Sequence, residues 1–418
     1  MKSDRRRPAR RSLVASNALD AGGRSIFGFA TDVIAVSVLG ASAAQMGLLN
    51  AAGMVAFLVL AAPVGVLVDR ASSRSTLVIS SLAKATLAAL AAALLLSATM
   101  TFGMLLVIVV VFGIFSLITE TSQVAAVPRV EKRSRIAALA GTLEAWDNGL
   151  GIVIPAAAAV ALTHIAGGWV LAAAAAVLAG AAVMASRLRV HRAEQDVSTE
   201  PRPPGSSSFL TEMRAGIEPF RTSAALRRIT MSTVLLNAAL AVISAVEMVY
   251  FLRVVGLSVA AVGVAATVGA VGGALGAGVS GRLVARLGLS RVVRVTSVVL
   301  FLAAGLLLAL SLPVPTIVLT LIICGQSFIW GMAQVAKNVA VYSWFTTVVP
   351  VDLLGRASGL QRTATMGVIP IASLIGGLLG SWNILASLSL GVVLILASGV
   401  WVWSVRPEAG PEPGQSAT

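Results

Sequence analysis

The chain has 418 residues, of which 57% are hydrophobic and 11% are charged, and its formal net charge is +14. Its mean hydropathy of +0.94 leaves too few polar side chains to cover the surface of a water-soluble fold. A single cysteine excludes an internal disulfide, and the two histidines belong to no cluster with metal-ligand spacing. We therefore expect a polytopic membrane protein with no metal, no cofactor and no enzymatic activity.

Long apolar runs define the predicted helices. A spanning helix needs about 20 mostly apolar residues, and the sequence contains about twelve such runs. The first half contains 13–38, 45–68, 75–97, 102–126, 136–162 and 168–186; the second half contains 229–252, 258–280, 292–312, 315–345, 357–380 and 383–405. The predicted fold is all-α, with one six-helix half over 13–186 and another over 229–405. A basic N-terminus (1–12), a central loop (187–228) and a tail (406–418) complete the chain.

The basic residues indicate topology rather than nucleic-acid binding. Lys and Arg crowd the N-terminus and then every second connection between apolar runs, with Arg253 as the exception. By the positive-inside rule, both termini and the central loop are expected on the cytoplasmic side of the plasma membrane. In the second part of the central loop, an apolar stripe predicts a helix on the membrane surface: Phe209, Met213, Ile217, Phe220 and Ala224. A partly ordered linker is the alternative.

One short loop occurs twice. Gly65–Arg74 and Gly281–Arg291 each separate two apolar runs, and each carries several charged residues. Repetition at half the chain length is typical of transporters built from two similar halves.

The pattern Gly-x-Leu-x-Asp-Arg-(x)3-Arg in the first loop resembles the signature loop of the major facilitator superfamily. Val127–Arg129 and Leu354–Leu360 resemble segments of its bacterial drug, macrolide and siderophore exporters. The resemblance implies a monomeric, proton-coupled exporter of a hydrophobic or amphipathic organic compound. Two alternatives stay open: an uptake symporter of the same fold, and a membrane receptor that does not transport.

The repeated loop supplies the candidate gate. Asp69 can pair with nearby arginines, and the resemblance implies that such a charged latch holds the cytoplasmic side shut. Gly65 is expected to permit close helix approach. The gating candidates are Gly65, Asp69, Arg70, Arg74, Gly281 and Arg286; a role in topology alone is the alternative.

Ionisable residues inside the spans are costly unless they are paired or hydrated, and they supply the proton-coupling candidates. Asp20 and Arg24 are one helical turn apart and are expected to neutralise each other. Asp32 and Glu247 have no adjacent cation in the sequence, so we expect them to be the better proton carriers. The other candidates are Asp20, Glu120, Glu144 and Asp147.

The substrate cavity is predicted around the tenth span. Lys337 is one of four lysines, and we expect Glu120 or Glu247 as its counter-ion. Amide and aromatic side chains near it suit an amphipathic ligand, although packing and contact with lipid are alternatives. The cavity candidates are Arg24, Trp146, Asn237, Gln326, Trp330, Gln334, Lys337 and Asn338.

The charge pattern predicts which loops are accessible from outside the cell. In a Cys324→Ser background, we expect a membrane-impermeant thiol reagent to label His164→Cys but not Pro203→Cys in whole cells. Labelling of the cysteine at position 203 alone would reverse the assigned orientation.

Overall fold

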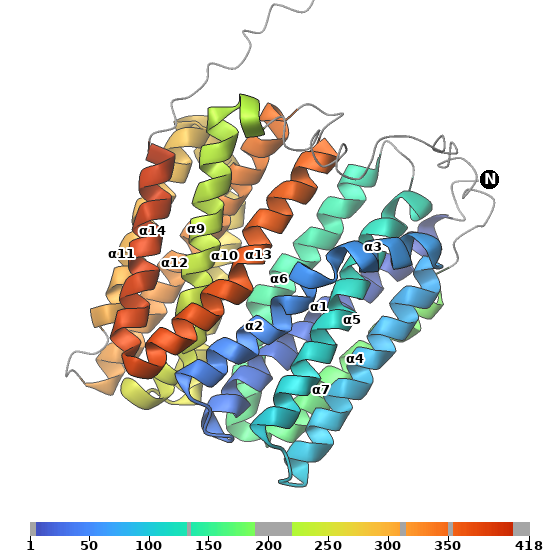
Figure 1. Cartoon of the computed structure of the whole chain (residues 1–418), viewed down its shortest axis with the longest axis horizontal. Helices are drawn as coiled ribbons and strands as arrows, with labels where there is room; N and C mark the ends of the chain where they lie inside the picture. The colour runs from blue at the N-terminus through green and yellow to red at the C-terminus, as the bar shows by residue number, and fades with distance from the viewer. Residues whose placement is uncertain (1–5, 132–134, 189–219, 310–314, 350–353, 404–418) are drawn as a thin grey trace, which may run out of the picture.

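A computed structural model describes residues 6–131, 135–188, 220–309, 315–349 and 354–403, and in these ranges it contains helices but no strand (Figure 1). The N-terminal half consists of α1 (Arg6–Ser37), α2 (Ala43–Val59), α3 (Ala61–Arg70), α4 (Ser73–Leu96), α5 (Phe102–Val130), α6 (Ile136–His164) and α7 (Gly167–Ser186). The C-terminal half consists of α9 (Ala224–Val249), the π-helical turn η3 (Tyr250–Val254), α10 (Val259–Leu287), α11 (Leu289–Ala309), α12 (Thr316–Val348), α13 (Leu354–Trp382) and α14 (Ile384–Trp403).

The predicted helical architecture is confirmed. Within the described residues, 10 helices are long and apolar enough to cross a membrane. The two other predicted spans are α1, which carries charged side chains in its middle, and the pair α2 and α3. Residues 209–219 of the expected surface helix lie outside the described residues; of its last two apolar positions, Phe220 packs against Leu226 and Ala224 begins α9.

The second predicted span is two helices rather than one. The helix breaks at Leu60, where φ is −105° and ψ is 0°. Pro63 lies three residues further and has no backbone N–H, so the carbonyl of Val59 loses its partner inside the helix. The expectation of one continuous helix over 45–68 was therefore wrong.

The two repeated loops are much shorter than expected. α3 continues to Arg70 and α4 begins at Ser73, while only Gly288 separates α10 from α11. Gly288 has a φ of +80°, which glycine adopts without strain. A Cβ on Gly65 would meet no atom within 4 Å, so no helix packs closely there and that expectation was wrong.

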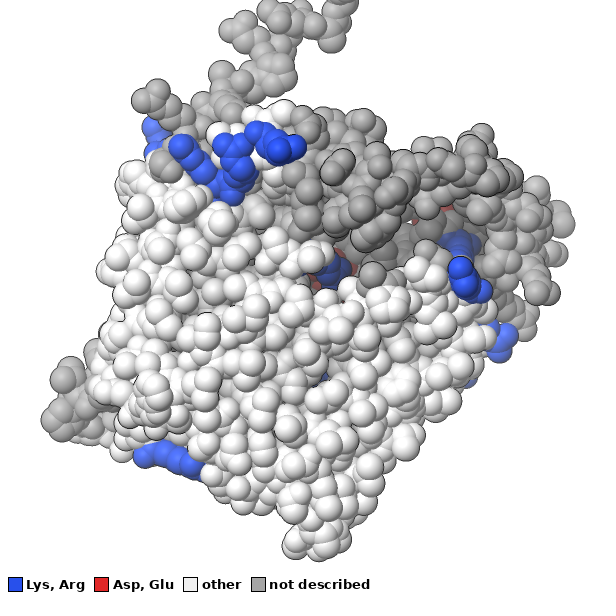
Figure 2. All heavy atoms as spheres, in the orientation of Figure 1, with Lys and Arg blue, Asp and Glu red and all other residues white. Residues whose placement is uncertain are grey.

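The arginines gather at one end of the bundle. Arg70, Arg74, Arg282, Arg286 and Arg291 are exposed at helix ends that meet on this side, and we call it the basic end. Most of the visible Lys and Arg atoms lie along the upper edge in Figure 2.

The two halves touch at the end opposite the basic end. Gly47 of α2 packs directly on the backbone of Ser373 and Gly377 of α13, and Gly263 of α10 packs on Ala159 of α6. Such close approach needs residues without side chains, because lipid provides no hydrophobic drive between helices.

Arg253, the exception to the charge pattern, lies at this opposite end. Its Nη2 donates a hydrogen bond of 2.8 Å to the carbonyl of Val36, in the last turn of α1. A cation is favourable there because the carbonyls at a helix C-terminus carry partial negative charge. Arg253 thus joins the halves through η3 and α1.

Toward the basic end, α6 and α10 separate. Gly149 and Gly151 of α6 face open space, as do Gly278 and Gly281 of α10, although the same helices touch at Ala159 and Gly263. These open positions lie toward the basic end, where Figure 2 shows a recess, and we call this recess the cavity. Figure 2 shows acidic and basic atoms together in a recess in the upper part of the molecule.

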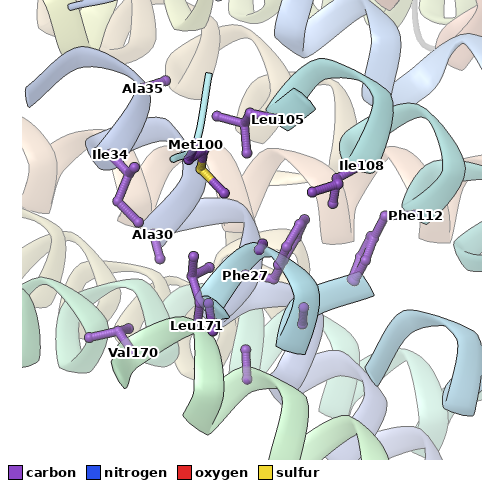
Figure 3. Close-up of a cluster of buried hydrophobic side chains, with 14 of the residues drawn as sticks. Phe27, Ala30, Ile34, Ala35, Met100, Leu105, Ile108, Phe112, Val170 and Leu171 are labelled. Atoms are coloured by element: carbon purple, nitrogen blue, oxygen red, sulfur yellow. The ribbon is translucent and has the colours of Figure 1, made fainter. Parts of the chain in front are cut away.

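The largest apolar cluster packs beside this cavity in the N-terminal half (Figure 3). The rings of Phe27 and Phe112 stack with centroids 4.1 Å apart, which holds α1 against α5. Lys84 Nζ lies 6.0 Å from the centroid of the Phe112 ring. The apolar cluster thus borders a charged group of the cavity.

The contact between α2 and α13 predicts a difference between two glycines. Gly47→Ala should lower the free energy of unfolding by about 1–3 kcal/mol, because the added Cβ meets backbone that cannot rotate away. Gly65→Ala should leave it unchanged or raise it by up to about 1 kcal/mol, because alanine favours an open helical position. Unfolding in mixed detergent and SDS micelles measures both; equal losses would contradict the described packing.

Candidate functional site

Arg24 is the centre of a charged network in the N-terminal half. Its Nη1 donates to Glu120 Oε1 at 2.7 Å and its Nη2 donates to Asp147 Oδ1 at 2.9 Å. Its Nε lies 3.1 Å from Asp20 Oδ2, an ion pair without hydrogen-bond geometry. All three nitrogens of the guanidinium therefore face carboxylates, and these come from α1, α5 and α6.

Lys84 of α4 belongs to the same network. Its Nζ is 2.5 Å from Asp20 Oδ1, and both side chains are fully buried. The expected pairing of Asp20 with Arg24 is thus confirmed in part, because Asp20 has two cations. Lys84 is not among the candidates of the sequence analysis, although a single lysine inside an apolar span already indicates a buried partner.

Arg362 of α13 extends the network into the C-terminal half. Its Nη2 donates to Glu120 Oε2 at 2.9 Å, and 62% of its side chain is exposed. Glu120 therefore lies between two arginines that belong to different halves. With three acids and three bases, the six linked side chains carry no net charge: Asp20, Glu120, Asp147, Arg24, Lys84 and Arg362.

Hydrogen bonds near these residues fix the register of their helices. Thr119, adjacent to Glu120, donates to Ser80 of α4 at 2.8 Å. Asn17, one turn before Asp20, donates to the carbonyl of Leu143 of α6 at 3.1 Å. Such contacts hold helices together in a membrane and align the charged side chains that meet here.

Asp32 and Glu247 form a second carboxylate pair. Asp32 lies on α1 and Glu247 on α9, so they belong to opposite halves, and both are half-buried. Their helices contact each other, and Val249 of α9 packs in the same apolar cluster as Ile34 of α1. The structure therefore brings together the two residues that the sequence analysis had ranked first as proton carriers.

The model of the Major Facilitator Superfamily matches residues 13–366. The chain belongs to this superfamily. It is similar to solved structures of the nucleoside transporter NupG, with 13% identity over 94% of this chain and 97% of that chain and a TM-score of 0.69. A bacterial homologue of the iron transporter ferroportin in an inward-facing state shares 15% identity over 95% and 99% of the two chains, with a TM-score of 0.73.

An unoccupied inward-facing bacterial homologue of the lysosomal transporter Spinster shares 13% identity, covering 95% of this chain and 96% of its own, with a TM-score of 0.65. At these identities the likeness shows the fold alone. A search of curated protein sequences found no match. The chain thus has the fold of a major facilitator transporter.

The signature loop of this major facilitator lies at the basic end. Arg70, Arg74 and Arg286 are exposed, and no ion pair involving them is found among the described side chains. The side chain of Asp69 lies outside the described part, and Gly281 faces open space. The latch that the resemblance implies stays a prediction.

Lys337 does not face the expected counter-ions. It is 2% exposed, and its Nζ contacts Ser398 Oγ of α14 at 3.4 Å. Glu120 is held by Arg24 and Arg362, and no carboxylate pairs with Lys337 among the described side chains. The expectation was wrong because the described partner of Lys337 is a serine hydroxyl of α14 and not a carboxylate.

The other predicted cavity residues do not form one surface. Gln326 is buried, Trp330 packs in the core of the C-terminal half, and Asn338 is exposed. The Oε1 of Gln334 is buried without a hydrogen bond in the described structure. Residues at the two edges of a broad helical stripe contact different neighbouring helices. Sequence spacing alone therefore predicted too many residues in the wall of the cavity.

Three predicted residues lie elsewhere on the cavity helices. Asn237 donates its amide to the carbonyl of Thr365 at 2.9 Å, which ties α9 to α13 one turn from Arg362. Trp146 and Glu144 are exposed on α6. Among the predicted cavity residues, Arg24 alone is a member of the charged network.

The two buried lysines predict opposite effects on stability. Lys84→Met should lower the free energy of unfolding by about 3–5 kcal/mol, because it leaves Asp20 buried with fewer partners. Lys337→Met, the matched control, should be neutral or stabilising because it strands no described carboxylate. Unfolding in SDS micelles tests this, and adding Asp20→Asn should recover part of the first loss; a larger loss for Lys337→Met would contradict the pairing.

Proposed function

We propose that the chain is a proton-coupled secondary transporter that moves a polar or charged organic molecule through the cavity between its halves. The observation that carries this proposal is the charged network of Arg24, Glu120, Asp147 and Arg362, whose side chains are 22–62% exposed. Charged groups at the base of a cavity offer hydrogen bonds and ion pairs that a hydrophobic ligand cannot use.

The proposed orientation places the basic end in the cytoplasm. The positive-inside pattern supports this, and the cavity then opens to the cytoplasm. The inward-facing states of the ferroportin and Spinster homologues are the corresponding conformation among the similar folds.

The network favours cotransport of a polar substrate with protons. Export of a hydrophobic compound in exchange for protons is the second candidate, supported by the resemblance of Val127–Arg129 and Leu354–Leu360 to exporter segments. The two candidates differ in the direction of substrate movement. A proton gradient directed inward drives accumulation of the substrate inside the cell in the first case and its extrusion in the second.

Proton coupling is assigned to Asp32 and Glu247. Two carboxylates from opposite halves repel each other when both are ionised, and a shared proton removes that repulsion. Closing the halves at this end brings the two groups together, whereas separating them exposes each group to water. The proton affinity of the pair would then follow the conformation, as coupling requires.

Neutralising either carboxylate should uncouple transport. We expect Asp32→Asn and Glu247→Gln to reduce gradient-driven substrate accumulation at least tenfold while sparing downhill exchange. The measurement uses inside-out and right-side-out vesicles with a compound panel and an imposed pH gradient, which also gives the direction of transport. Glu131→Gln, at the basic end of α5, is the control carboxylate variant.

Wild-type accumulation with unchanged pH dependence in both variants would contradict this assignment. The proton site would then have to be sought at Glu120, Glu144 or Asp147. Absence of substrate-dependent proton flux with every compound would instead favour a receptor.

A further inference from the structure

The two arginines of the network differ in their capacity to bind a ligand. Each guanidinium nitrogen of Arg24 faces a carboxylate, and 23% of its side chain is exposed. Arg362 is 62% exposed, and one of its nitrogens is engaged, by Glu120. Its other N–H groups make no hydrogen bond with described residues, so Arg362 can accept a further anion and Arg24 cannot.

The bond between Arg362 and Glu120 is also the weakest of the network. Water screens an exposed ion pair, and such a pair contributes little to stability. Asp20 and Lys84 are fully buried, and Arg24 binds its carboxylates at lower exposure. A competing carboxylate or phosphate can form two parallel hydrogen bonds with a guanidinium, whereas Glu120 gives one described hydrogen bond.

Contacts within the C-terminal half fix the position of Arg362 at the boundary between the two halves. The carbonyl of Thr365, one turn along α13, accepts the hydrogen bond from Asn237 of α9. Gly376, three turns further, packs on the backbone of Val242 of α9. The arginine therefore moves with the C-terminal half, while Glu120 and Arg24 move with the N-terminal half.

We propose that Arg362 binds the negatively charged group of the substrate, a carboxylate or phosphate ester, which replaces Glu120 on the guanidinium. This inference rests on the proposed transport function and adds the chemical class of its substrate. The substrate then adds negative charge to a network that has none in total, and it separates the described ion pair between the halves.

Charge balance determines what accompanies the anion. Glu120 faces Arg24 and Asp20 on α1, Lys84 on α4, Asp147 on α6 and Arg362 on α13. The neighbouring α2 has no titratable side chain, and α3 has Asp69 and Arg70 at the basic end. Once Arg362 pairs with the substrate, Glu120 keeps Arg24 as its cation, and the network together with its substrate has an excess of negative charge. Proton uptake by Asp32 and Glu247, the pair to which coupling is assigned above, balances that charge, so anion and proton bind together as cotransport requires.

The test measures binding to the purified full chain in nanodiscs of phosphatidylcholine. The probes are benzoate, hexanoate and phenyl phosphate, compared with benzylamine and hexylamine. Thermal unfolding gives the affinity, and a pH-sensitive dye in weak buffer gives the protons taken up. We expect at least one anionic probe to bind the wild type with uptake of one proton, and the amines not to bind.

The variants separate the two roles. Arg362→Gln should weaken anion binding at least tenfold, and Arg362→Lys should restore part of it. Glu120→Gln should strengthen binding at least fivefold, because the competing carboxylate is gone. Arg291→Gln, an exposed arginine at the basic end, should change neither quantity.

Several results would overturn the inference. Binding of the amines with proton release would place a cationic substrate on the carboxylates instead. Loss of anion binding in Glu120→Gln, or binding to Arg362→Gln with wild-type affinity, would show that Glu120 and the anion do not compete for Arg362. Stabilisation by phosphatidylglycerol nanodiscs alone would assign the site to lipid headgroups. Proton-coupled transport in vesicles without anion binding would leave the proposed function intact while rejecting the substrate class.

Discussion

The ion pairs of Arg24 are the constraint on which the N-terminal half depends. A charge inside a bilayer costs several kcal/mol unless it is paired or hydrated. Arg24 satisfies this requirement by binding Asp20, Glu120 and Asp147, and Asp20 in turn binds Lys84. The helices α1, α4, α5 and α6 must therefore keep the positions that bring these groups together, and the hydrogen bonds of Asn17 and Thr119 hold the same registers.

The two ends of the bundle are joined by different forces. At the end opposite the basic end, Gly47 and Gly377 bring two backbones into contact, and dispersion forces there depend steeply on distance. At the cavity, the described link is the ion pair of Glu120 with Arg362, which water and ligands reach. Alternating access needs one end of the bundle to stay closed while the other opens. Tight backbone contact at one end and a water-exposed ion pair at the other meet this requirement.

The two halves share a fold but differ in the chemistry of their interiors. The N-terminal half carries the paired charges, including the buried Lys84. The C-terminal half also contains a buried lysine, Lys337, but its described contact is a serine hydroxyl. Two halves can therefore share the same helix packing although the side chains in their interiors differ, because the partners of each side chain are set by the residues around it. For this reason, the similarity of the two halves does not indicate where the charged network lies.

The sequence by itself determined the helices, their grouping into two halves and the importance of the charges in the first span. It could do so because hydrophobicity and the cost of a buried charge act on each segment separately. Only the tertiary structure decided that Asp20 binds Lys84, that Arg362 reaches Glu120 in the other half and that Lys337 contacts Ser398 rather than a carboxylate. These outcomes depend on the rotation and register of helices that are distant in the chain, and both are set by close contacts such as Gly47 on Gly377. Such contacts leave no periodic signal in the sequence from which a partner could be read.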